Sequence, residues 1–119
     1  MSGSIFLKNN VVLVSNKSFY NLLDWAVSIA KEIEHSRSEE FIKAFEEKNR
    51  HKWTPCTSLD IQEEFTADEA DFWSLVFKEI AEKVFRRELG NTSDLTWQSG
   101  FIHAAWKIHE MLHDYAKSS

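Results

Sequence analysis

The segment from Thr66 to Gly90 most constrains the fold, because it carries both a start and a stop signal for one long helix. Thr66 and Glu69 have the spacing of a capping box, and Phe65 with Ala70 fits a hydrophobic staple. Gly90 supplies a typical helix stop. Seven apolar residues recur at helical spacing and cover about half of the circumference, as expected of the central helix of a bundle. These are Phe72, Trp73, Val76, Phe77, Ile80, Ala81 and Val84.

Three further segments show helical periodicity. The first runs from Ser18 to about His35, with Ser18 as the predicted cap. The second runs to about Asn49 and begins at a Ser36–Glu39 capping box, with Ser38 as an alternative cap. The last runs from Ser93 or Asp94 to about Ala116, and its apolar stripe contains Phe101, Ala105, Ile108, Leu112 and Tyr115. Together with the helix after Thr66, these segments predict four main helices.

The rest of the chain predicts little further regular structure. Two short apolar runs between Ser4 and Val14 flank Asn9-Asn10, a pair that favours a tight hairpin turn. We expect a loop from Arg50 to Ser58, which contains Pro55 and Cys56, and a short helical turn over residues 58–64. The predicted fold class is therefore all-α: one domain spanning residues 1–119, a compact bundle with a short N-terminal β-hairpin.

Composition excludes several classes of function. The formal net charge is −5 and the basic residues are scattered, which argues against a nucleic-acid partner. No apolar run approaches the roughly 18 residues that suggest a membrane helix. The first residues lack the basic and apolar parts of a signal peptide, and a single cysteine permits no internal disulfide, so we expect a cytoplasmic protein. No glycine-rich phosphate-binding motif occurs, and we expect no cofactor.

The run His109-Glu110-Met111-Leu112-His113 has the H-E-x-x-H spacing of a helical zinc site. One turn separates the two histidines, so both could reach one ion, and Glu110 could act as a general base. A catalytic zinc usually takes three protein ligands, and only residues 114–119 follow the motif. At about 100° per residue, Glu110 points away from the apolar stripe. We therefore interpret the histidines as part of a packing or contact row that contains Ile102, Trp106, His109 and His113.

Acidic residues are concentrated in one segment. Between Trp53 and Phe77 the chain has six acids and no lysine or arginine. Helix capping explains some of them, but the remainder would form a surface patch of one sign beside three aromatic residues, Phe65, Phe72 and Trp73. Such a patch would steer a basic protein partner into contact. The predicted partner-binding residues are Asp60, Glu63, Glu64, Phe65, Asp68, Glu69, Asp71 and Phe72.

Small size, acidity and the lack of an assembled catalytic set are similar in kind to bacterial immunity and antitoxin-type inhibitors. This similarity implies a non-enzymatic protein that neutralises a cognate toxin, for example a basic nuclease. Two alternatives remain open from the sequence. One is a zinc-dependent hydrolase with His109 and His113 as ligands, and the other is a small regulatory subunit that dimerises through the Trp106/His109 row.

Overall fold

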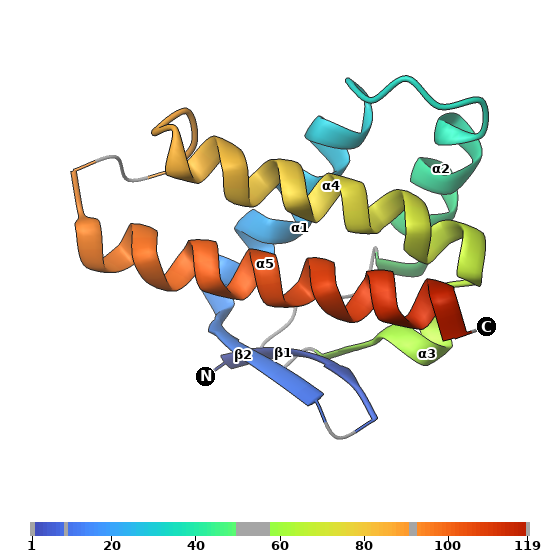
Figure 1. The fold of residues 1–119 in the computed structure, drawn as a ribbon, viewed down its shortest axis with the longest axis horizontal. Helices are drawn as coiled ribbons and strands as arrows, with labels where there is room; N and C mark the ends of the chain where they lie inside the picture. The colour runs from blue at the N-terminus through green and yellow to red at the C-terminus, as the bar shows by residue number, and fades with distance from the viewer. Residues whose placement is uncertain (1, 9, 50–57, 91–92, 119) are drawn as a thin grey trace.

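The computed structural model describes residues 2–8, 10–49, 58–90 and 93–118. These residues form strands β1 (Ser2–Leu7) and β2 (Asn10–Ser15), helices α1 (Asn16–Ala30) and α2 (Ser38–Asn49), strand β3 (Ser58–Asp60), and helices α3 (Ile61–Glu64), α4 (Ala67–Phe85) and α5 (Leu95–Ser118). Figure 1 shows α4 and α5 side by side, with α1 behind them and the strands along one side of the helices. The four predicted main helices are all present.

The all-α prediction is wrong, because the strands form a mixed three-stranded sheet and the fold is α+β. The strand order is β2-β1-β3, with β1 antiparallel to β2 and parallel to β3. Ile5 of β1 pairs with Val12 on one side and with Leu59 on the other, and all three side chains are buried. A three-residue strand that pairs with a distant part of the chain leaves no periodic signal in the local sequence.

The predicted N-terminal hairpin is present, but it turns earlier than expected. Leu7 pairs with Asn10, so the chain already reverses at Lys8, whose φ is 54°. The sequence had suggested Asn9-Asn10 as the turn, and Asn9 lies outside the described residues. A lysine in the left-handed region is uncommon, which is why residue preferences pointed to the asparagines.

The helix boundaries differ from the predicted ones at several ends. Ser15, not Ser18, caps α1, since its hydroxyl accepts a hydrogen bond from the Ser18 amide at 3.1 Å. The α1 helix ends at Ala30 rather than near His35, and α2 begins at Ser38. The loop predicted between Arg50 and Ser58, including Cys56, lies outside the described residues except for Ser58, which begins β3.

Helix α4 confirms the strongest signal in the sequence. Thr66 accepts from the Glu69 amide at 3.2 Å, and the Thr66 amide donates to the Glu69 carboxylate at 2.9 Å. The helix ends at Phe85, before the predicted stop at Gly90. Gly90 is nevertheless required, because its φ is 79° and a Cβ there would clash with the Trp97 ring.

One hydrophobic core joins the helices to the sheet. Helix α4 packs against both α1 and α5, as expected for a central helix. Trp73 is fully buried, and its ring lies 4.4 Å from that of Phe45 in α2 and 5.2 Å from that of Phe72. This core places the first turn of α4 close to α2.

Candidate functional site

The predicted acidic segment divides into exposed and structural residues. Glu63, Asp68 and Asp71 are exposed, and Glu64 is half-buried. In contrast, Asp60 caps α3 by accepting from the Gln62 amide at 3.0 Å, and Glu69 is buried in the capping box.

The aromatic residues of the predicted site all belong to the core. Phe65 is 6% exposed and stacks on Phe45 at 6.1 Å between ring centroids. Phe72 is 1% exposed, with its ring 5.4 Å from that of Phe41, and Trp73 is fully buried. These side chains lie on the inner face of α4 and its entry loop, so the folded protein does not offer them to a partner. The exposed side chains of the predicted site are therefore its carboxylates.

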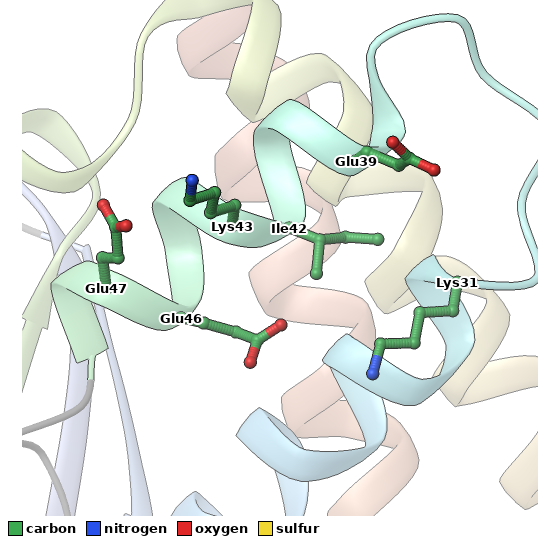
Figure 2. Close-up of a pocket in the computed structure, with 6 residues that line it drawn as sticks. All are labelled: Lys31, Glu39, Ile42, Lys43, Glu46 and Glu47. Atoms are coloured by element: carbon green, nitrogen blue, oxygen red, sulfur yellow. The ribbon is translucent and has the colours of Figure 1, made fainter.

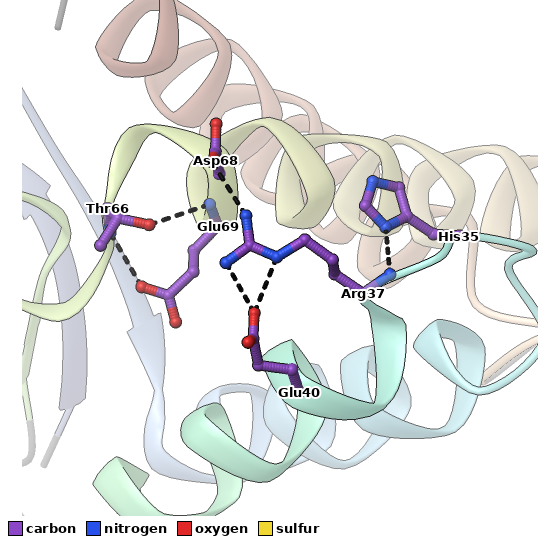
Figure 3. Close-up of polar contacts among 6 residues, drawn as sticks. All are labelled: His35, Arg37, Glu40, Thr66, Asp68 and Glu69. Carbon is purple, nitrogen blue, oxygen red and sulfur yellow. Dashed lines mark hydrogen bonds and ion pairs between the residues drawn. The ribbon is translucent and has the colours of Figure 1, made fainter.

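Arg37, which no sequence motif marks, joins the acidic segment to α2. Its Nη1 donates to Asp68 at 3.0 Å, while Nε and Nη2 donate to Glu40 at 2.8 and 2.6 Å (Figure 3). The guanidinium carbon lies 4.7 Å from the centre of the Phe41 ring. These carboxylates, Glu40 most strongly, raise the pKa of Arg37 above its ordinary value. The carboxylates of two helices therefore share one guanidinium.

His35 positions the segment that carries Arg37. Its Nδ1 accepts a hydrogen bond from the Arg37 amide at 3.1 Å (Figure 3). The centre of its ring lies 5.6 Å from that of Phe41 and 5.3 Å from that of Phe72. An accepting Nδ1 means that Nε2 carries the proton in the neutral ring. This contact holds the turn before α2 against the core, with Arg37 directed towards α4.

Helix α2 extends the acidic surface towards α1. An open hollow of about 610 Å³ between the two helices is lined by Lys31, Glu39, Ile42, Lys43, Glu46 and Glu47 (Figure 2). Glu46 and Lys31 extend into it from opposite helices. Three carboxylates against two amines leave the lining slightly acidic.

The residues of the predicted row, Ile102, Trp106, His109 and His113, lie along one flank of α5. The Trp106 and His109 rings are 4.9 Å apart, and those of His109 and His113 are 5.9 Å apart. Trp106 is 41% exposed, whereas Ile102 is partly buried against the core. His109 also contacts α4, because its Nδ1 lies 2.7 Å from the Ser74 carbonyl oxygen. A carbonyl can only accept, so Nδ1 carries the proton and Nε2 is left as an acceptor.

The two histidines of the zinc hypothesis have adjacent rings, but the described residues bring no third ligand to them. Within residues 2–8, 10–49, 58–90 and 93–118, no group of three or more His, Cys, Asp or Glu side chains could hold a metal ion. Glu110, the proposed base, is exposed.

Within the residues that the structure describes, no helix combines the length and apolar character needed to cross a bilayer.

Comparisons of the chain with protein-family models, curated proteins and solved structures give no match.

Proposed function

We propose that this chain is a non-enzymatic binding protein whose acidic surface occludes a basic partner. In its most concrete form it is a cytoplasmic immunity protein that neutralises a cognate toxin, such as a basic nuclease. One observation carries the proposal: exposed carboxylates from α2 and from the start of α4 are close enough to bind one guanidinium, that of Arg37. We call the exposed Glu39, Glu40, Glu63, Asp68 and Asp71 the acidic face.

The Arg37 contacts support recognition of basic side chains. Asp68 and Glu40 approach the guanidinium from different helices, so their spacing already suits a planar, multidentate cation. An arginine of a partner could compete with Arg37 for the same oxygens. Because Arg37 is exposed, its pairing with Glu40 and Asp68 should be weak enough to exchange.

Because the aromatic residues of this region are buried, we expect electrostatic attraction to be the main contribution to partner binding. With Phe65 and Phe72 in the core, the acidic face offers mainly carboxylates to a partner. Charged surfaces of this kind accelerate association and make it sensitive to salt. We therefore expect fast binding that slows steeply as ionic strength rises.

Charge reversal tests the proposal. The variant Glu63→Lys/Asp68→Lys/Asp71→Lys reverses three exposed acids and should slow association with a basic toxin domain encoded by a neighbouring gene at least about tenfold at low salt. Its association rate should also depend less on salt. Stopped-flow kinetics across a series of NaCl concentrations measures both quantities.

The matched control is Asp24→Lys/Glu110→Lys/Asp114→Lys, which reverses three exposed acids on α1 and α5. Both triple variants change the formal net charge from −5 to +1, since each reversal adds two charges. Equal slowing in the two variants would assign the effect to net charge and remove the acidic face as the site. Failure of the wild-type chain to inhibit the encoded toxin would overturn the immunity function itself.

A further inference from the structure

We propose that His109 and His113 form a two-histidine site for a divalent first-row transition metal ion, such as Zn²⁺, Ni²⁺ or Cu²⁺. The site lies on the α5 flank, and the proposal does not depend on the acidic face. It differs from the hydrolase hypothesis because it needs no third protein ligand and no catalytic base.

His109 already has the arrangement of a metal ligand. Its protonated Nδ1 donates to the Ser74 carbonyl at 2.7 Å, which fixes the tautomer and the ring orientation. Histidines that bind metals through Nε2 commonly donate their other ring proton to a backbone carbonyl or carboxylate. Ser74 is buried in α4, so this acceptor is held in place by the core. The orientation of the His109 ring, with Nε2 unprotonated, is therefore set before an ion binds.

His113 lies one helical turn further along the same flank. The two rings are 5.9 Å apart between centroids and inclined by 23°. With metal–nitrogen distances of about 2.0–2.1 Å, two imidazoles on one ion have ring centroids about 5 Å apart. In the part of the chain that the structure describes, His113 makes no hydrogen bond, so its ring can rotate to close this gap. Side chains four residues apart on a helix suit such chelation.

The ligand set determines which ions can bind. Two neutral imidazoles favour Cu²⁺, Ni²⁺ and Zn²⁺ over Mg²⁺ and Ca²⁺, which prefer oxygen ligands. The remaining coordination positions are left for water, because the described residues bring no third ligand to the site. We therefore expect one exchangeable ion per chain.

Trp106 provides a reporter of binding, since its ring lies 4.9 Å from that of His109. Titration with Ni²⁺ should quench tryptophan emission in the wild-type protein, and Trp106→Phe should lose most of that quenching. Calorimetric titration with Zn²⁺ should give one equivalent, and a tenfold excess of Mg²⁺ should leave the binding curve unchanged.

Two ligand variants and one control identify the site. His113→Ala should weaken Zn²⁺ and Ni²⁺ binding at least about tenfold. His109→Asn should do the same while its side-chain amide still donates to Ser74, so its melting temperature without metal should match that of the wild type. His103→Ala removes an exposed histidine from the same helix and should leave binding unchanged.

Several results would overturn the assignment. Wild-type affinity in His113→Ala would place the ion elsewhere, as would an equal loss in His103→Ala. Wild-type affinity in His109→Asn would show that His109 is not a ligand and would also overturn the site.

Discussion

The acidic start of α4 and the histidine row of α5 look equally rich in functional side chains, but the fold uses them differently. At the start of α4, Asp60 and Glu69 cap helices and Asp68 binds Arg37. On α5, His109 is held by one nitrogen only, and His113 by none among the described contacts. The first region thus combines structural carboxylates with exposed ones, whereas the second keeps ligand nitrogens available. Residue type alone does not reveal this difference.

The two regions also differ in how their aromatics are placed. Phe72 in the acidic segment is fully buried, while Trp106 in the histidine row is 41% exposed. The acidic region therefore contributes apolar stability and a charged outer surface. The histidine row has an exposed indole beside its rings, which makes it the better source of an apolar contact.

The largest expected effect contrasts these two aromatics. Phe72→Ala should lower the free energy of unfolding by about 3–5 kcal/mol, because it leaves a cavity between α2 and α4. Trp106→Ala should change it by less than about 1 kcal/mol, since much of the ring already faces water. Urea unfolding monitored by circular dichroism measures both. Comparable losses would contradict the division between a core residue and a surface residue.

A smaller effect tests whether Glu69 is a capping residue rather than a binding residue. Thr66→Ala and Glu69→Ala should each cost about 1 kcal/mol of unfolding free energy, through loss of the two capping-box hydrogen bonds. The double variant should cost less than the sum, because each bond stabilises the same helix start. Fully additive losses in the denaturant cycle would show that the two residues act independently.

The hydrogen bond between α5 and α4 should contribute a similar amount to stability. His109→Ala removes the donor to the Ser74 carbonyl and should destabilise the metal-free protein by about 0.5–1.5 kcal/mol relative to His109→Asn. Thermal unfolding in the presence of a chelator measures the difference. Identical melting temperatures for the two variants would mean that the hydrogen bond has no stabilising role.

The smallest effect on stability, and the most informative for binding, concerns Arg37. Arg37→Gln should leave the melting temperature within error, because exposed ion pairs contribute little. It frees two carboxylates of the acidic face, so association with a basic toxin domain should become faster. Arg87→Gln, an equal charge change beyond the end of α4, is the control. Slower association of Arg37→Gln than of this control would mean that Arg37 itself contacts the partner.

Much of the helical structure could be predicted because its signals are local. The capping box at Thr66 and the apolar face of α4 depend on spacings of three and four residues. The parallel pairing of Ile5 with Leu59 could not be predicted in the same way, because it depends on how the intervening helices return the chain to β1. This is why the fold class was wrong although the main helices were present.

The candidate sites, too, have features that local sequence predicts and features that depend on long-range contacts. The concentration of acids before Phe77 and the spacing of His109 and His113 are properties of the sequence itself. Which acids face water, and which ring nitrogen is free, depend on Arg37 and Ser74, which lie 31 and 35 residues from their partners. Such contacts have no periodic trace in the chain, since they form only when α2, α4 and α5 pack together. The sequence determined which chemical groups are present, and the tertiary structure decided which of them are available.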